Sequence, residues 1–300
     1  MNNSMTCNPN TGVCEISLDV NLDDFEYVAP VIKNKVIVEY FTDPTCAACW
    51  GLEPVLRDFE EKFGDDIDVR YIMGGMLDKS RLTKEEAMAS ADHWEEFGEM
   101  FNMPITGDVM RNEPLTSSYP PSLAYIAAKN QDMTKANRLI RKMREGLLVH
   151  AQNVDKEELL QQLAKEVGLD VNQFMMDFYS PETMDKLEYD IAYTRVNGVG
   201  GFPTVIMYGK DKPSMIIRGV RQLHEYSDAL SNFVELKPKK IKYTLKELFD
   251  KYELLSTREV SELMDVYFVE DMAKDLDKLV EEDYLEKILV NDGCYWRKKK

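Results

Sequence analysis

The order of apolar and polar positions predicts an α/β unit near the start of the chain. Residues 36–41 are β-branched and aromatic, which is typical of a buried strand. Apolar residues recur at helical spacing over 47–63, and residues 67–73 alternate as a second strand that stops at Gly74-Gly75. The pattern therefore predicts a β-α-β unit over residues 36–75.

Helical periodicity then continues from residue 80 to residue 196 without a convincing strand. Strands return at 204–208 and 215–220, joined by a polar hairpin, and a helix over about 223–236 follows. We therefore expect a helical insertion within an α/β domain. The spacing predicts inserted helices near 83–101, 121–130, 134–150, 155–167, 171–179 and 181–196.

The last quarter of the chain has its own pattern. Residues 237–242 are rich in lysine and resemble a linker, and two capping-box spacings, Thr244/Glu247 and Ser256/Glu259, open further helices. Three helices near 244–253, 256–266 and 271–284, followed by a hairpin over 285–296, are the layout of a winged helix. The boundaries we expect are an N-terminal tail (1–30), an α/β domain (31–79 and 197–236), an inserted helical domain (80–196), a linker (237–242) and a winged-helix-like domain (243–300).

Composition excludes several classes of function. Lys and Arg number 37 against 54 Asp and Glu, a net charge of −17, whereas duplex DNA and anionic membranes attract basic proteins. Residues 243–300 hold ten Lys and Arg against fifteen Asp and Glu, so we expect this domain to bind a protein partner rather than nucleic acid. No run of eighteen apolar residues and no secretory signal is visible, which predicts a cytoplasmic protein that does not enter a membrane.

The strongest chemical signal is the pair Cys46-Ala47-Ala48-Cys49, directly after the first strand and at the start of the first helix. The positive end of a helix stabilises a thiolate. We therefore expect Cys46 to be exposed, acidic and the attacking thiol, and Cys49, one turn further in, to resolve the mixed disulfide. Zinc would need a second such pair or clustered histidines, and the three histidines are far apart in sequence. We expect neither a metal nor an organic cofactor.

Three sequence blocks together resemble DsbA-family thioredoxin-like proteins, and most of all the FrnE-like branch of predicted dithiol–disulfide isomerases. The blocks are Phe41-Thr42-Asp43-Pro44-Thr45-Cys46-Ala47-Ala48-Cys49-Trp50, Met73-Gly74-Gly75 and Gly198-Val199-Gly200-Gly201-Phe202-Pro203-Thr204. They also resemble the SpxH (YjbH) family of adaptors, which deliver a transcription factor to an ATP-dependent protease. The resemblance covers roughly residues 30–236 and implies a thioredoxin-like fold of the DsbA type with a helical insertion.

The resemblance also implies roles for single residues. Cys46 would be the nucleophile, Cys49 the resolving thiol, and Pro203 a cis proline packed against both sulfurs. The backbone of Phe202 would pair with a bound extended peptide as an added strand. The implied partners are cysteine-containing proteins or peptides and a cellular dithiol reductant.

Further site residues remain open between a functional and a structural interpretation. Trp50 and Phe202 are candidates for an apolar peptide-binding rim, and Thr204 is a further candidate for substrate binding. Glu39 interrupts an apolar strand. The resemblance implies a buried acid there that carries the proton of Cys49, and the alternative is a strand-edge glutamate facing solvent. Periplasmic DsbA proteins carry a histidine inside the cysteine pair, where this chain has Ala47-Ala48, so we expect a less oxidising couple, nearer the thioredoxin range.

Two more cysteines, Cys7 and Cys14, flank a turn-rich segment in what we expect to be a flexible tail. They are either an auxiliary dithiol that exchanges with Cys46 and Cys49, or tail thiols with no role, or a weak metal site. For the whole chain we predict a thiol–disulfide oxidoreductase or isomerase. The alternative is an adaptor or redox-sensing interaction protein with little turnover. Because all proposed redox groups precede the linker, we expect the dithiol to work without residues 243–300.

Overall fold

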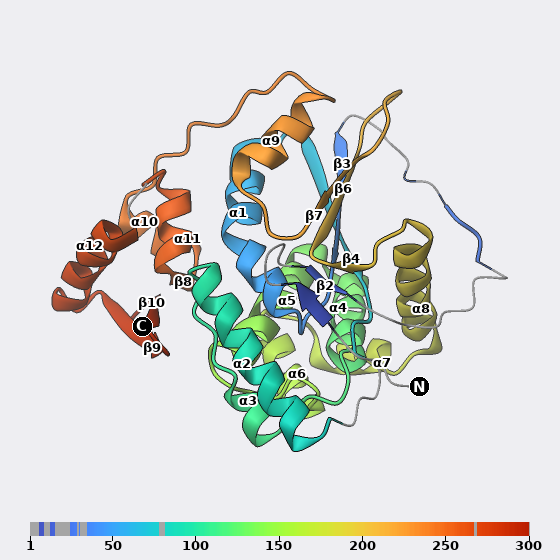
Figure 1. The fold of residues 1–300 in the computed structure, drawn as a ribbon, viewed down its shortest axis with the longest axis horizontal. Helices are drawn as coiled ribbons and strands as arrows, with labels where there is room; N and C mark the ends of the chain where they lie inside the picture. The colour runs from blue at the N-terminus through green and yellow to red at the C-terminus, as the bar shows by residue number, and fades with distance from the viewer. Residues whose placement is uncertain are drawn as a thin grey trace.

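The computed structural model describes residues 6–8, 13–15, 25–28, 30, 35–77, 82–266 and 269–299, and for the first two of these ranges it describes the backbone. The predicted α/β domain is built on a four-stranded sheet with the strand order β4-β3-β6-β7 (Figure 1). Its strands are β3 (Val36–Thr42), β4 (Ile67–Met73), β6 (Thr204–Tyr208) and β7 (Met215–Arg218). β3 runs parallel to β4, as a β-α-β unit requires, and antiparallel to β6, which pairs with β7 as an antiparallel hairpin.

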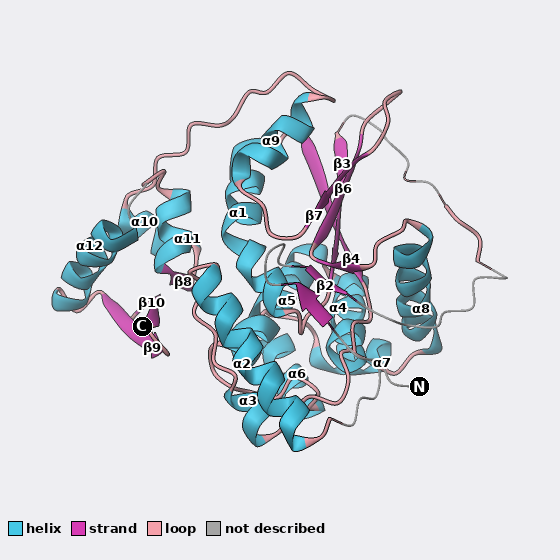
Figure 2. Cartoon of the chain, in the orientation of Figure 1, coloured by secondary structure: helices cyan, strands magenta, loops and turns pink. Residues whose placement is uncertain are grey.

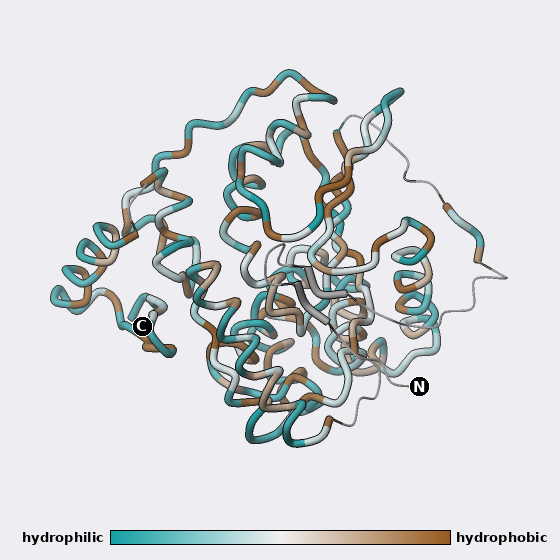
Figure 3. The backbone as a smooth tube through the Cα atoms, viewed as in Figure 1, coloured by the Kyte–Doolittle hydropathy of each residue, from teal (hydrophilic) through white to brown (hydrophobic). Residues whose placement is uncertain are grey.

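Helices cover both faces of this sheet. Figure 2 shows α1 (Ala47–Phe63) and α9 (Leu223–Ser231) on one side and α8 (Pro181–Val196) on the other. All seven residues of β3 are buried, which explains their continuous apolar run. The strands of the sheet are brown where they pass between the helices in Figure 3, so the hydrophobic core lies there. Helix α9 ends at Ser231, five residues before the end that we expected.

The predicted insertion is helical in its described residues. Six of its helices match those expected from the sequence, and one short helix, α3, was missed. The helices are α2 (Lys84–Met100), α3 (Asp108–Asn112), α4 (Tyr119–Gln131), α5 (Met133–Leu148), α6 (Glu157–Glu166), α7 (Val171–Phe178) and α8. The Thr83–Glu86 capping box forms as predicted, with both reciprocal hydrogen bonds at the start of α2.

The N-terminal segment contains two strands, so the expectation of a flexible tail was wrong for these residues. β1 (Thr6–Asn8) pairs with β2 (Val13–Glu15), and β2 pairs with β5 (Gly201–Phe202). Three-residue strands carry little pattern of their own. They form here because the edge of β5 offers unpaired backbone groups far along the chain.

The C-terminal region, residues 243–300, has three helices and a three-stranded sheet with its own apolar cluster around Leu276 and Trp296. Its elements are α10 (Leu245–Lys251), β8 (Leu254–Ser256), α11 (Thr257–Leu263), α12 (Val269–Glu281), β9 (Leu285–Val290) and β10 (Gly293–Lys298). The helices and the hairpin were expected and β8 was not. The winged-helix assignment and the domain boundaries stay predictions.

Candidate functional site: a buried dithiol

The cysteine pair lies at the junction between β3 and α1. Cys46 is the N-cap of α1, and its sulfur accepts the backbone N–H of Cys49 at 3.2 Å. Asp43 shapes the turn just before it. One oxygen of its carboxylate accepts the backbone N–H and hydroxyl of Thr45 at 2.9 and 2.8 Å, and the other accepts the N–H of Met76 at 2.8 Å. This turn fixes the direction in which the helix leaves the sheet, and with it the position of both sulfurs.

Neither thiol is exposed, which contradicts our expectation for Cys46. Both residues have 0% exposure. Burial raises the pKa of Cys46 well above its usual value, and the hydrogen bond that it gives to Cys49 raises it further. Burial also acts to raise the pKa of Cys49, but the hydrogen bond from Cys46, the nearby Arg144 guanidinium and a hydrogen bond from Thr42 together lower it. In this closed arrangement the lower pKa of the pair therefore belongs to Cys49 and not, as we expected, to Cys46.

The predicted proline site lies at the same end of the sheet. The Phe202–Pro203 peptide bond is cis, as predicted. Phe41 pairs with Thr204 in the antiparallel ladder, so Pro203 follows opposite Thr42, just before the dithiol turn. The sequence thus placed these two distant segments together correctly. Packing of Pro203 against the two sulfurs stays a prediction.

The two neighbours of Pro203 lie inside the protein rather than on an exposed rim. Phe202 is fully buried, and its ring packs so closely on Gly74 that a Cβ atom there would lie 1.6 Å from the ring. Thr204 is also buried, and its hydroxyl donates to the carbonyl of Gly201 at 2.8 Å. Both residues therefore fix the backbone on either side of Pro203, between β5 and β6. Contact between their side chains and a peptide stays a prediction.

The backbone of β5 is already paired with the chain's own N-terminal strand. Cys14 is the register partner of Phe202, and Glu15 is the partner of Gly201. On the other edge of β2, Cys14 is opposite Cys7. The two cysteines that we singled out as an auxiliary dithiol are thus register partners in a ladder that ends beside Pro203. Their redox role stays a prediction.

Trp50 does not lie on an exposed rim either, and its contact with a peptide stays a prediction. It has 0% exposure, and its indole N–H donates to the hydroxyl of Tyr295 in β10 at 2.8 Å. The Arg141 guanidinium lies 4.1 Å from the centre of the indole ring. The C-terminal region is therefore packed directly on the first turn of the dithiol helix. We expected the dithiol to work without residues 243–300, and this expectation stays a prediction.

Glu39 is buried, as one of our two interpretations required, but it faces away from the dithiol. Tyr193 on α8 donates its hydroxyl to both Glu39 oxygens at 3.1 and 3.0 Å. Its neighbour Tyr40 points to the other face of the sheet, where its hydroxyl donates to the carbonyl of Cys49 at 3.4 Å. Burial raises the pKa of Glu39, and the bond from Tyr193 offsets part of this rise. The opposite facing of Glu39 removes our reason for making it the proton carrier of Cys49.

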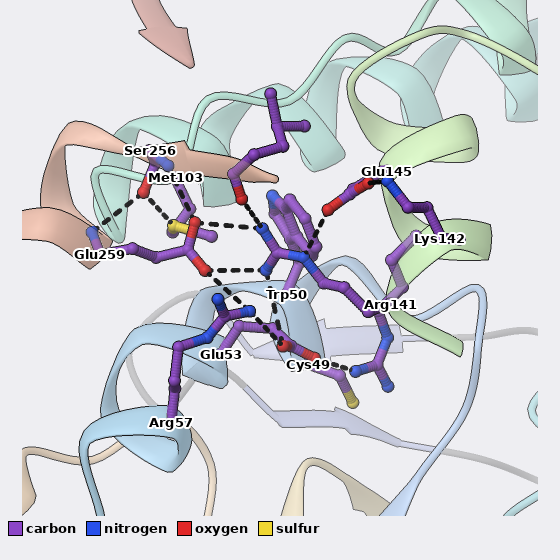
Figure 4. Close-up of polar contacts among 12 residues, drawn as sticks. Cys49, Trp50, Glu53, Arg57, Met103, Arg141, Lys142, Glu145, Ser256 and Glu259 are labelled. Carbon is purple, nitrogen blue, oxygen red and sulfur yellow. Dashed lines mark hydrogen bonds and ion pairs between the residues drawn. The ribbon is translucent and has the colours of Figure 1, made fainter. Parts of the chain in front are cut away.

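Sequence reasoning missed the charged groups that do surround Cys49. Arg144 on α5 is fully buried and donates to the Thr42 hydroxyl at 2.6 Å and to the Asp43 carbonyl at 3.2 Å, and it is also ion-paired with Glu53. Figure 4 shows Glu53 next to Cys49 and between guanidinium groups that reach it from both sides. The available signal was an arginine at a position of α5 that helical periodicity assigns to the buried face.

Two absences apply to the described part of the chain. No group of three or more His, Cys, Asp or Glu side chains in it is placed to hold a metal ion. No helix within the same ranges combines the length and apolar character that crossing a bilayer requires.

Comparison with known proteins agrees with this architecture. The family model described as "Thioredoxin" matches residues 40–228. The ClpXP adapter protein SpxH of Halalkalibacterium halodurans is 32% identical over 98% of this chain and 97% of its own length, and SpxH of Bacillus subtilis is 25% identical over 88% and 90%. The cytosolic disulfide reductase DsbM from Pseudomonas aeruginosa has the same fold, with a TM-score of 0.55 and 21% identity over 65% of this chain and 97% of that one. The chain therefore has a thioredoxin-like fold of the DsbA type and belongs both to the thioredoxin family and, over nearly its whole length, to the family of SpxH adapter proteins.

Proposed function

We propose that the chain is a cytoplasmic thiol–disulfide oxidoreductase or isomerase, which exchanges the Cys46–Cys49 dithiol with cysteines of a protein or peptide. The observation that carries this proposal is the cysteine pair at the start of α1, at the same sheet end as Pro203. Cys46 would attack a client disulfide, form a mixed disulfide and release one client thiol. Cys49 would then attack Cys46, release the second client thiol and leave the Cys46–Cys49 disulfide. A cellular dithiol would return the two electrons.

The pairing of β2 with β5 suggests how a client would bind. A peptide that adds to the edge of β5 would make the same backbone contacts as residues 13–15. We propose that this N-terminal strand holds the place of the client and must leave before a client strand can pair. The register of Cys14 with Phe202 favours an internal exchange between the N-terminal cysteines and the Cys46–Cys49 pair over a tail without a role.

A trapping experiment tests the exchange reaction. In a Cys49→Ala variant Cys49 can no longer resolve the mixed disulfide on Cys46, so client proteins should stay attached for longer than in the wild type, until a reductant is added. A Cys46→Ser variant, and a Cys294→Ser variant that keeps both active cysteines, are the matched controls. The proposal fails if Cys49→Ala captures no more protein than Cys46→Ser.

An adaptor function is the second candidate, and the identity to SpxH over 98% of the chain favours it. That match includes the C-terminal region, for which dithiol exchange alone gives no reason. Under this hypothesis the chain would deliver a bound client to a protease of the ClpXP type. Degradation of a co-purified client by ClpXP should then be equally fast with the wild type and with a Cys46→Ser/Cys49→Ser variant. If turnover of the client is lost with the two cysteines, thiol exchange is required and the pure adaptor hypothesis fails.

A further inference from the structure

The dithiol site contains a buried cation, Arg144, that lies outside the sequence motif of the two cysteines. Arg144 has 0% exposure, and its terminal nitrogens are directed at Thr42, Asp43 and Glu53. Its Nε is buried without a hydrogen-bond partner. A guanidinium confined in this way cannot lose its proton or turn to water. Its charge is therefore a fixed part of the surroundings of the two sulfurs.

Thr42 connects this charge to the resolving thiol. Its hydroxyl oxygen accepts from Arg144 at 2.6 Å. The charge of Arg144 and the Thr42 hydroxyl both act to lower the pKa of Cys49. Arg144 thus favours the reduced thiolate form of the pair over the disulfide, because only the thiolate carries a negative charge for it to stabilise.

A series of alternating charges runs from Arg144 to the C-terminal region, and Figure 4 shows its part from Glu53 through Arg141 to Glu259. Glu53 pairs with Arg144 on one side and lies 3.5 Å from Arg141 on the other. Arg141 in turn makes two hydrogen bonds to the Glu259 carboxylate on α11, at 2.8 and 3.1 Å. Glu259 has 0% exposure and also lies 3.4 Å from Arg57 of the dithiol helix. The negative charge that α11 contributes to this series, on Glu259, is therefore paired with cations of α5 and α1, Arg141 and Arg57.

The two groups at the ends of this series of charges are both negative when Cys49 is a thiolate. A thiolate at Cys49 and the carboxylate of Glu259 draw on the same intervening cations, since Glu53 is shared by Arg144 and Arg141. When the thiolate is lost to a disulfide, the ion pair of Arg144 with Glu53 becomes stronger. Glu53 then competes less for Arg141, and the ion pair of Arg141 with Glu259 becomes stronger as well. Direct repulsion between the two anions acts in the same direction. Docking of Glu259 therefore destabilises the thiolate, and the thiolate weakens the docking of Glu259.

We infer that Arg144 is a positioning residue that sets the redox equilibrium of the dithiol, and that Glu259 opposes it through Arg141 and Glu53, so that the C-terminal region docks more tightly on the disulfide form than on the thiolate form. This inference rests on the redox activity proposed above. By thermodynamic linkage, whatever factor docking adds to the stability of the disulfide, disulfide formation adds to the stability of docking.

The redox equilibrium tests the role of Arg144 without any client. One oxidised glutathione takes two electrons from the dithiol and becomes two reduced glutathiones, leaving the Cys46–Cys49 disulfide, and the fraction oxidised gives the equilibrium constant. At neutral pH, Arg144→Gln should shift this constant about tenfold toward the disulfide, about 30 mV in reduction potential. Arg144→Lys keeps the charge and should recover most of the shift. If the lysine and glutamine variants have the same potential, or if neither differs from the wild type, the assignment of Arg144 is wrong.

A second variant keeps the test valid if Arg144→Gln does not fold. Thr42→Val has nearly the same shape, leaves Arg144 in place and removes the hydroxyl between it and Cys49. It should shift the equilibrium about threefold toward the disulfide, since one hydrogen bond to the sulfur is worth less than a buried charge. Thr42→Ser, which keeps the hydroxyl, should match the wild type. A Thr42→Val potential equal to that of Thr42→Ser would contradict the connection.

Amide hydrogen exchange over α11 tests the docking. In the wild type these amides should exchange at least about threefold faster in the reduced protein than in the oxidised protein. Glu259→Gln should abolish this difference and shift the glutathione equilibrium toward the reduced form. Glu262→Gln on the same helix, whose carboxylate lies 3.5 Å from Arg258, is the control and should keep the wild-type behaviour. Equal exchange in both redox states of the wild type would overturn the inference, even if the trapping experiment shows that the dithiol reacts with clients.

Discussion

The hydroxyl of Tyr295 makes the most sharply defined contact between the C-terminal region and the dithiol helix. It accepts the indole N–H of Trp50 at 2.8 Å and donates to the backbone carbonyl of Pro104 at 2.7 Å. Both Trp50 and Tyr295 have 0% exposure, so water does not replace the bond between them. The change Tyr295→Phe removes one oxygen atom, keeps the ring and leaves the buried Trp50 indole N–H and the half-buried Pro104 carbonyl without this partner.

The size of the effect follows from those two groups. A buried donor or acceptor that loses its hydrogen-bond partner costs about 1–3 kcal/mol. With some relaxation of the Pro104 carbonyl, Tyr295→Phe should lower the free energy of unfolding by about 3 kcal/mol. The packing of the two rings, whose centres lie 6.1 Å apart, should be kept, so a cavity adds little to the cost.

Urea unfolding followed by tryptophan fluorescence measures this loss. Tyr284→Phe is the matched control in the same region, because its hydroxyl makes exposed contacts of 3.3 Å to Lys246 and Asp250. The control should lose less than about 1 kcal/mol. If Tyr295→Phe costs no more than Tyr284→Phe, the contact with Trp50 does not hold the two parts together, and the docking argument built on it fails.

Three further outcomes are expected. Burial and the Glu53 charge raise the pKa of Glu60 to about 7, so the folded protein binds its proton more tightly than the unfolded chain, and stability should fall as the pH rises from about 4.5 to 7. Glu60→Gln should remove about 2 kcal/mol of this fall in urea titrations at both pH values, and an unchanged pH profile would contradict the assignment. Gly74→Ala should cost about 2 kcal/mol because its Cβ would overlap the Phe202 ring, whereas Gly200→Ala, with open space around it, should cost little, as thermal unfolding can check. Removal of residues 1–24 should speed the reaction of a model peptide disulfide about tenfold by freeing the edge of β5, and an unchanged rate would show that β2 does not compete with clients.

Local pattern predicted the elements well because each element buries its own apolar face. The run at 36–41, the helical block and the returning strands all fold as predicted, and the order of motifs placed Pro203 beside the dithiol turn. Residues 6–8 and 13–15 escaped prediction because a three-residue strand exists only through its partner, here Gly201–Phe202.

Errors about the site have a common physical cause. Periodicity shows which face of a helix or strand is buried but not which neighbour covers it. Trp50 was predicted to present an apolar surface at the site, but in the structure that surface is covered by Tyr295, 245 positions away in sequence. Glu39 is buried, as one of the two interpretations required, but its side chain lies on the face of β3 that packs against Tyr193 and not on the face of Cys49. Arg144 was missed because a buried arginine is rare unless it is paired, and its partners come from other segments.

The burial of both sulfurs requires part of the protein to move before a client cysteine can reach Cys46. The N-terminal strand β2 is held to β5 by two register pairs, which is a small barrier at about 1 kcal/mol per backbone hydrogen bond. The C-terminal region is held by the buried Glu259 pairs, by the Trp50–Tyr295 bond and by further ion pairs such as Lys62–Asp265, which makes its release far more costly. Access should therefore be controlled at the N-terminal end and the redox equilibrium at the C-terminal end. Removing residues 1–24 should then change the rate of exchange but not its equilibrium constant, while Glu259→Gln should change the equilibrium constant. A truncated protein with a shifted equilibrium constant would show that the two ends act on the dithiol together.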